Sequence, residues 1–451
     1  MHAEHFDPHR LLIARQLSGL SQSALASHLG IHQTTVSLYE CGTKTPNDEM
    51  ICGLAKALSC SVQFLTPLED LATMPAEHLS EVFFRSLRST PSPDRLRALG
   101  ICGAVELLAA ILLELGHHLP KVALPLERGD LLDEEALPET DAHFLPKDKD
   151  GFTSFVDGID PLHAAYQTRQ AWGLGDAPIP NLLSLLEQHG VLTVTIPDMN
   201  AGTVDAFSYW KGMRPIVALN HQKRDPFRSR FDAAHELGHL LMHRGLPSME
   251  RESKQKAPRK PSQIMEDQAN AFAGELLVPG HVWISQAPRS ANPYAYLPGK
   301  KRWGVSVKAL ITRSHRVGIL NDKQYQAAHK RYSKLGWNRG EPNSDTIEHE
   351  QPSLLGEFVA AAAAKHHLSP KAYLQQLLLL PGSISELIFP DTEKKLHSLN
   401  DRRSRMKQND PRIQGAIRET LVPVYNPELL PLGANQPDPP SQVVQLFPNK
   451  K

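Results

Sequence analysis

The stretch FDAAHELGHLLMHR, residues 231–244, contains two histidines and a glutamate in the order H-E-x-x-H. Leucines and alanines surround them at helical spacing, which predicts a buried amphipathic helix. Positions four apart share one face of a helix, so His235 and His239 can direct both imidazoles at one ion. These polar groups are costly on a buried helix unless something satisfies them. The stretch therefore predicts a zinc site, with Glu236 placed to take a proton from water as general base.

A catalytic zinc site uses three protein ligands, so a third is needed here. His243 is eight residues beyond His235, about 12 Å along the axis, so we interpret it as structural or as a support for a ligand. In the helical pattern EDQANAFAGELLVP, residues 266–279, Glu266 shares the buried face with Ala269 and Phe272, whereas Glu275 faces away. We expect Glu266 to be the third ligand and one Zn²⁺ to bind per chain.

Two nearby residues have roles that the sequence leaves open. Asp232 could orient a ligand imidazole, or it could cap the metal-binding helix. Tyr209 is a weak candidate for stabilising an oxyanion. It lies in GTVDAFSYWKGMRPIVALN, residues 202–220, which predicts a hairpin. The hairpin either offers an edge to an extended peptide or simply completes a small sheet.

These motifs, with WGVSVKALITRSHRVGIL downstream, resemble the ImmA/IrrE family of zinc metallopeptidases over about residues 160–345. The resemblance implies a small thermolysin-like (gluzincin) α+β fold, with zinc held by His235, His239 and Glu266 and with Glu236 as general base. It also implies a bacterial or phage regulatory protein, whose zinc-dependent endopeptidase cleaves a helix-turn-helix repressor to control stress or mobile-element genes.

The stretch GLSQSALASHLGIHQTTVSLYECGTKTP, residues 19–46, predicts two short helices joined by a turn at Gly30. Their inward positions are apolar and include Leu25, Ala26, Val36 and Tyr39. Two short helices joined by such a turn form a helix-turn-helix motif, whose second helix can enter the major groove of DNA.

Residues 10–65 resemble the Cro/CI-type (XRE) helix-turn-helix family, which implies a five-helix DNA-binding domain and an ion pair between Arg15 and Glu40. By position, the expected base-edge contacts are His32, Gln33, Thr34 and Ser37, and the expected phosphate contact is Gln22. Residues 1–66 carry four basic and five acidic side chains. One domain should therefore bind a DNA operator weakly and need a homodimer or a second contact. Alternatively, these polar residues belong to a protein-binding module.

Composition describes a globular, multidomain chain. Lysine plus arginine equals aspartate plus glutamate, 49 each in 451 residues, so the whole molecule attracts neither polyanions nor polycations. The four cysteines lack metal-site spacing, and we see neither a secretory signal nor a membrane span, so we expect a cytoplasmic protein. The predicted fold class is mainly α with an α+β part. The predicted domains are a helix-turn-helix at 1–66, a helical segment with an acidic, proline-rich linker at 67–159, the peptidase at 160–345, and a helical region with a poorly ordered tail at 346–451.

One basic segment, residues 296–318, gathers six cationic side chains around Trp303: Lys300, Lys301, Arg302, Lys308, Arg313 and Arg316. Basic residues around an aromatic suit single-stranded DNA as an effector, although a helix packed on the peptidase core explains them equally well. Two functions follow from the whole sequence. One is a regulatory zinc protease, and the other is a transcriptional regulator or antitoxin whose peptidase domain is a sensor or scaffold without turnover.

Overall fold

The structure is a computed structural model of the chain. It describes residues 5–67, 92–114, 118–125, 159–196, 206–211, 214–220, 225–244, 261–344 and 347–377. The predicted tail, the acidic part of the predicted linker and the tip of the predicted hairpin lie outside these residues.

The N-terminal region consists of five helices: α1 (Pro8–Leu17), α2 (Gln22–Leu29), α3 (Gln33–Glu40), α4 (Asp48–Ala57) and α5 (Val62–Leu65). Ser21 caps α2 by accepting a hydrogen bond from the Ala24 amide at 3.1 Å. Gly30 ends α2 in the left-handed conformation at φ 65°, which glycine adopts without strain. The Arg15 guanidinium and the Glu40 carboxylate form the expected ion pair, which joins α1 to the end of α3. The region is the predicted helix-turn-helix.

A three-stranded sheet follows, formed by β1 (Leu192–Thr195), β2 (Ala206–Lys211) and β3 (Arg214–Leu219) in the order β1-β3-β2. β3 runs parallel to β1 and antiparallel to β2, as the predicted hairpin requires. Successive side chains of a strand point to opposite faces of its sheet. Ser208 and Trp210 therefore share one face, and Phe207 and Tyr209 share the other.

Two long helices cover the Ser208 face of the sheet. α9 (Pro226–Met242) packs on β2 and β3, and α10 (Pro261–Leu277) packs on α9. At Gly238 the two helices approach so closely that a Cβ would lie 3.0 Å from Cδ1 of Phe272. This contact sets the H-E-x-x-H motif of α9 directly opposite the first turns of α10. Two further helices, α7 (Pro161–Ala171) and α8 (Leu182–Gln188), pack against this pair.

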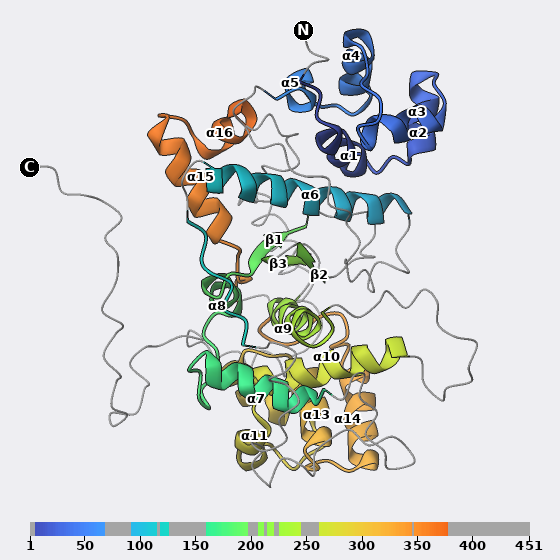
Figure 1. Ribbon diagram of the computed structural model, residues 1–451. Coiled ribbons are helices and arrows are strands. Elements are labelled where there is room, and N and C mark those ends of the chain that lie inside the picture. The colour runs from blue at the N-terminus through green and yellow to red at the C-terminus, as the bar shows by residue number, and fades with distance from the viewer. Residues whose placement is uncertain are drawn as a thin grey trace, which may run out of the picture.

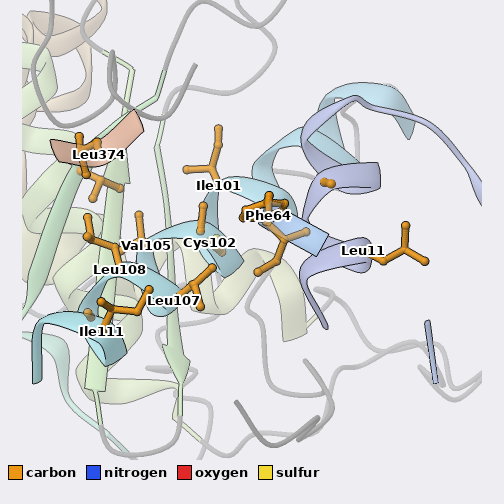
Figure 2. Close-up of a cluster of buried hydrophobic side chains, with 14 of the residues drawn as sticks. Leu11, Phe64, Ile101, Cys102, Val105, Leu107, Leu108, Ile111 and Leu374 are labelled. Carbon is orange, nitrogen blue, oxygen red and sulfur yellow. The ribbon is translucent and has the colours of Figure 1, made fainter. Parts of the chain in front are cut away.

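The opposite face of the sheet is covered by α6 (Ser92–Glu114), which also packs on α1 (Figure 1). Figure 2 shows apolar side chains of α6 near Leu11 of α1, Phe64 of α5 and Leu374 of α16 (Pro370–Leu377). Phe207 and Tyr209 of β2 belong to the same buried cluster. α6 lies within the helical segment predicted between residues 67 and 159, and it is a core element. The helix-turn-helix and the sheet share one hydrophobic core through it.

Within α6, residues 93–113 are long and apolar enough to cross a membrane, the one such helix in the part of the chain that the structure describes. However, 72% of its most apolar stretch is buried inside the protein. This burial is typical of the core helix of a globular protein, and the length and composition of one helix are weak evidence for a membrane span.

The remaining described helices complete two sides of the molecule: α11 (Gly280–Gln286), the 3-10 helix η6 (Pro293–Tyr296), α12 (Leu297–Trp303), α13 (Val307–Arg316), α14 (Asp322–Lys334) and α15 (Leu354–Lys365). α11 to α14 continue the α9–α10 side, whereas α15 and α16 return to pack beside α6 (Figure 1). The result is a mostly helical protein with one small α+β part.

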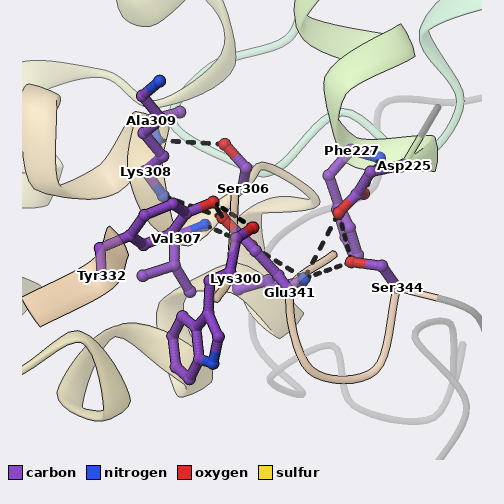
Figure 3. A network of polar contacts seen from close by, with 11 residues as sticks. Asp225, Phe227, Lys300, Ser306, Val307, Lys308, Ala309, Tyr332, Glu341 and Ser344 are labelled. Atoms are coloured by element: carbon purple, nitrogen blue, oxygen red, sulfur yellow. Dashed lines mark hydrogen bonds and ion pairs between the residues drawn. The ribbon is translucent and has the colours of Figure 1, made fainter. Parts of the chain in front are cut away.

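The buried carboxylate of Glu341 organises the α12–α13 region (Figure 3). It accepts hydrogen bonds from Lys300 Nζ at 2.9 Å, from the Val307 amide at 2.8 Å and from the Tyr332 hydroxyl at 2.9 Å. It thus caps the N-terminus of α13 and neutralises a buried lysine at once.

This packing removes Trp303, Lys300 and Arg313 from the predicted single-stranded DNA surface. The Trp303 side chain is 1% exposed and donates its ring N–H to Gln286, so it cannot stack on a base. Lys300 is buried on Glu341, and Arg313 is buried on Glu275. Each cation neutralises a buried carboxylate, which the sequence pattern alone did not reveal. The alternative interpretation, a helix packed on the core, applies to all three residues.

Candidate metal centre and nucleic-acid interface

Three candidate ligand atoms converge between α9 and α10. His235 Nε2 lies 3.0 Å from His239 Nε2 and 3.4 Å from Glu266 Oε2, and His239 Nε2 lies 3.6 Å from Glu266 Oε1. Zinc binds such atoms tetrahedrally at about 2.0–2.1 Å, which sets the ligand atoms about 3.3 Å apart. The observed separations bracket that value. The residues fit one zinc ion with an open fourth position.

Each imidazole of the cluster is oriented through its other nitrogen. His235 Nδ1 lies 3.1 Å from Oδ1 of Asn270, and His239 Nδ1 lies 2.8 Å from Nδ1 of His243. An amide oxygen can only accept, so His235 carries its proton on Nδ1 and directs the lone pair of Nε2 at the site. Asn270 was not predicted from the sequence. The available signal was its position four residues after Glu266, on the same face of α10.

Glu236 lies beside the cluster in a nearly closed environment, with 7% of the residue exposed. The Ser208 hydroxyl of β2 donates to Glu236 Oε2 at 2.6 Å. Burial raises the pKa of Glu236 to about 7, against the positive charge of His235 and the Ser208 hydrogen bond, which both lower it. A carboxylate with a pKa near neutrality is suited to general acid–base catalysis. Ser208 is a second residue that sequence reasoning missed, because it is 28 positions away in the chain.

Burial lowers the pKa of His235, but the hydrogen bond to Glu266 and the charges of Glu236, Glu266 and Asp232 raise it above its ordinary value. This excess of negative charge around two imidazoles favours a bound cation. Asp232 contributes to that field from within α9. The side chain that caps this helix is Asp225, which accepts from the Phe227 amide at 2.9 Å, so the capping role considered for Asp232 is wrong. Its role in orienting an imidazole stays a prediction.

Tyr209 does not reach the metal centre. It belongs to the opposite face of β2, where it is fully buried in the α6 cluster. Burial raises the pKa of its hydroxyl well above the ordinary value, and the nearby Cys102 and Glu106 raise it further. Successive side chains of β2 point to opposite faces, so Ser208 reaches Glu236 whereas Tyr209 points toward α6. The assignment of Tyr209 as an oxyanion-stabilising residue is therefore withdrawn.

The expected DNA-contacting residues gather at the start of α3. His32, Gln33 and Thr34 are exposed there, whereas Ser37 is half-buried one turn later. The His32 ring caps α3 by accepting from the Thr34 amide at 3.3 Å, which leaves its outer edge in solvent. Such a surface can meet base edges.

The Gln22 side chain contacts the ion pair between Arg15 and Glu40. Its side-chain nitrogen donates to Glu40 Oε2 at 2.8 Å, so the amide is held against α3. A nitrogen already bound to a carboxylate is less available for a phosphate than the sequence suggested. Contact with phosphate would use its second hydrogen.

Comparison with protein families finds two matches, in the order expected. Residues 11–65 match a family described as helix-turn-helix, and residues 186–315 match one described as the IrrE N-terminal-like domain, a peptidase family. Comparison with curated proteins finds no significant match. The second match contains His235, Glu236, His239 and Glu266, together with the supporting residues Ser208 and Asn270.

Proposed function

From a chain that joins a helix-turn-helix region to an IrrE N-terminal-like domain, we propose a cytoplasmic regulatory protein with zinc-dependent endopeptidase activity. The observation that carries this proposal is the convergence of three candidate ligand atoms at tetrahedral spacing, with the Glu236 carboxylate beside them. A zinc site that serves binding alone does not need a buried carboxylate of this kind.

In the proposed reaction His235, His239 and Glu266 hold one zinc ion, which supplies Lewis acidity toward water and a peptide carbonyl. Glu236 accepts a proton from the attacking water and returns it to the leaving amine. Ser208 holds the Glu236 carboxylate in place, and Asn270 holds the ring of His235. Burial raises the pKa of the Glu236 carboxylate, which favours its role as the proton acceptor.

β2 offers a place for an extended substrate. It pairs with β3 along one edge, and no other strand of the described residues pairs with it. A peptide added at the free edge would run beside Ser208, and so beside Glu236. For the substrate we propose a helix-turn-helix repressor, which the resemblance to the ImmA/IrrE family suggests.

The first test compares wild-type protein with Glu236→Gln, His239→Ala and Glu266→Gln. We expect about one zinc per chain in the wild type and in Glu236→Gln, and loss of zinc in the two ligand variants. Helix-turn-helix repressors encoded in the same genome serve as substrates. Cleavage should require both zinc and Glu236. Continued cleavage by Glu236→Gln at full zinc content would overturn the mechanism.

The helix-turn-helix is proposed to bind a DNA operator through His32, Gln33, Thr34 and Ser37, as a homodimer or with a second contact. The near-neutral charge of residues 1–66 supports the need for that second contact. A gel shift on the promoter of the protein's own gene, at low salt, tests this part. Absence of a shift there would favour protein recognition by the same surface.

A second function is a transcriptional regulator or antitoxin that senses zinc or a peptide without turnover. The shared core favours it, since α6 touches both the helix-turn-helix and the sheet that carries Ser208. Zinc-dependent DNA binding, with no cleavage of any repressor by the zinc-loaded wild type, would select this function over the protease.

A further inference from the structure

A chain of buried hydrogen bonds leads away from the metal centre. His239 Nδ1 lies 2.8 Å from Nδ1 of His243, and His243 Nε2 lies 3.2 Å from Oε1 of Gln268. Gln268 Nε2 donates to the backbone carbonyl of Ile159 at 3.0 Å. His239, His243 and Gln268 are exposed by 6%, 1% and 3%. The relay therefore joins α9, α10 and the segment that leads into α7.

The Ile159 carbonyl fixes the direction of every hydrogen bond in this relay. A carbonyl oxygen can only accept, so Gln268 turns its nitrogen to Ile159 and its oxygen to His243. The amide oxygen also only accepts, so His243 must carry its proton on Nε2. In a neutral His243 ring that is the only N–H proton, so Nδ1 presents a lone pair to His239, which donates from its own Nδ1. A neutral imidazole has one such proton, so His239 Nε2 is left bare toward Glu266 and His235.

We propose that His243 and Gln268 are positioning residues that hold His239 in its Nδ1–H tautomer, so that Nε2 stays available to a metal. The inference rests on the proposed zinc site. It goes beyond that site because it makes the affinity of the centre depend on a backbone carbonyl 80 residues before His239. In the opposite tautomer the Nε2 proton of His239 would occupy the ligand position.

The relay also explains why two ligands on one helix have different supports. His235 is held in one step by Asn270, from the same helix as Glu266. His239 is held in three steps that end on the segment leading into α7. Any displacement of that segment from α10 would release Gln268 and let His243 adopt either tautomer. α10 thus supports all three ligands, and His239 depends in addition on the segment that leads into α7.

The first experiment reads the tautomers directly, by long-range ¹H–¹⁵N correlation spectra of the full chain labelled at histidine. The spectra are recorded without metal near pH 8.5, about two units above the ordinary histidine pKa, where neutral rings are expected. Difference spectra with His243→Asn and His239→Ala assign the two rings. We expect an Nε2–H tautomer for His243 and an Nδ1–H tautomer for His239. An Nδ1–H tautomer for His243 would overturn the proposal, and this result does not depend on whether zinc binds.

The second experiment measures zinc affinity by chelator competition in Gln268→Met, His243→Leu and His243→Asn. Loss of a residue that supports a metal ligand typically costs about 10–100-fold in metal affinity, which we expect for Gln268→Met and His243→Leu. His243→Asn should recover most of it, because its amide oxygen can take the place of the accepting Nδ1. An exposed variant, Gln188→Met, controls for the substitution itself.

The outcomes separate the relay from the proposed function. Equal weakening in His243→Leu and His243→Asn would reduce the relay to a packing effect. Wild-type affinity in Gln268→Met, with its histidine tautomers unchanged, would remove Gln268 from it. If the wild type binds no zinc although both tautomers are as expected, the proposed metallopeptidase fails while the relay stands. Unfolding midpoints of all variants identify any that fail to fold.

Discussion

Ser208 has more influence on the proposed chemistry than its residue type suggests. Its hydroxyl donates to the Glu236 carboxylate at 2.6 Å and to the Glu236 backbone carbonyl at 3.2 Å. Because one hydroxyl has one proton, these two contacts alternate or share it. The hydrogen bond lowers the pKa of Glu236 against the larger effect of burial. Ser208 therefore orients the candidate general base and moderates the rise in its pKa.

Replacing Ser208 with alanine should slow cleavage without removing zinc. A hydrogen bond to a charged group is worth about 1.5–3 kcal/mol, so we expect roughly a 10–100-fold lower kcat/KM. The measurement pairs repressor cleavage with zinc content for each protein. Zinc loss in Ser208→Ala would make the serine a support for the site as a whole rather than for Glu236.

Tyr209→Phe is the matched control, since Tyr209 is the next residue of the same strand but faces α6. We expect unchanged zinc content and an unchanged rate of cleavage, although removal of a buried hydroxyl can alter stability. A rate loss in this variant, with folding intact, would restore Tyr209 as a candidate for stabilising the oxyanion.

At the scale of elements, the crossing of α1 and α6 decides how the helix-turn-helix is attached. Gly100 and Gly103 lie where the helices meet. A Cβ on Gly100 would lie 2.4 Å from the backbone nitrogen of Leu17, and one on Gly103 would lie 2.8 Å from Cγ1 of Ile13. The first contact is with backbone, which cannot rotate away. The two helices can therefore pack this closely only with glycine at position 100.

We expect Gly100→Ala to lower the free energy of unfolding by about 1–3 kcal/mol, the usual cost of overpacking a core. Gly53→Ala in α4 is the control, because its new Cβ would make an ordinary contact 3.5 Å from Cδ2 of Leu29. That control should be neutral or stabilising by up to about 1 kcal/mol, since alanine favours helix. Denaturant unfolding measures both. Equal stability of the two variants would contradict the close contact between Gly100 and the backbone of α1.

A second link between elements is the buried carboxylate of Glu187 in α8. It accepts from the Thr193 hydroxyl at 2.6 Å and from the Ser353 amide at 3.0 Å, and so ties β1 to the start of α15. Burial raises the pKa of Glu187 above its ordinary value of 4.5, although these hydrogen bonds lower it. The folded protein therefore holds this proton more tightly than the unfolded chain does.

Because folding raises the pKa of Glu187, its contribution to stability is greatest below the unfolded pKa. That contribution is lost as pH rises through the folded pKa. The difference in unfolding free energy, Glu187→Gln minus wild type, should thus increase as pH rises above about 4.5. Denaturant unfolding across that range measures it, with Glu357→Gln as an exposed reference on α15. A difference that stays constant or decreases would show that the folded pKa is not raised.

At the scale of the whole molecule, one hydrophobic core extends from the helix-turn-helix through α6 to the sheet. On the far side of the sheet the metal centre lies between α9 and α10. A chain organised in this way should unfold cooperatively rather than domain by domain. A ligand of the metal centre should then stabilise the helix-turn-helix as well.

Two probes can follow the two parts of the molecule separately. All five tryptophans lie between residues 172 and 337, so their fluorescence reports on the peptidase part. Cys41 and Cys52 are exposed, and a dye attached to them reports on the helix-turn-helix. We expect coincident thermal midpoints that rise together on adding zinc. Two separate transitions, with only the tryptophan signal shifted by zinc, would contradict a shared core.

Features that depend on neighbours along one helix could be predicted from the amino-acid sequence. The H-E-x-x-H spacing puts His235 and His239 on one face of α9, and the apolar period of α10 selects Glu266, so the cluster could be predicted before any fold. The helix-turn-helix followed in the same way from its turn at Gly30 and its inward apolar positions. These signals are local, because helical geometry fixes which residues share a face.

Contacts between segments distant in sequence became apparent in the three-dimensional fold. It brought Ser208 to Glu236, turned Tyr209 toward α6, and buried Lys300 and Arg313 on carboxylates far away in sequence. It also packed the predicted helical segment, α6, between the helix-turn-helix and the sheet. Such pairings depend on which faces of separate elements pack together. Periodicity indicates that a face is buried, but it does not indicate which other element covers that face.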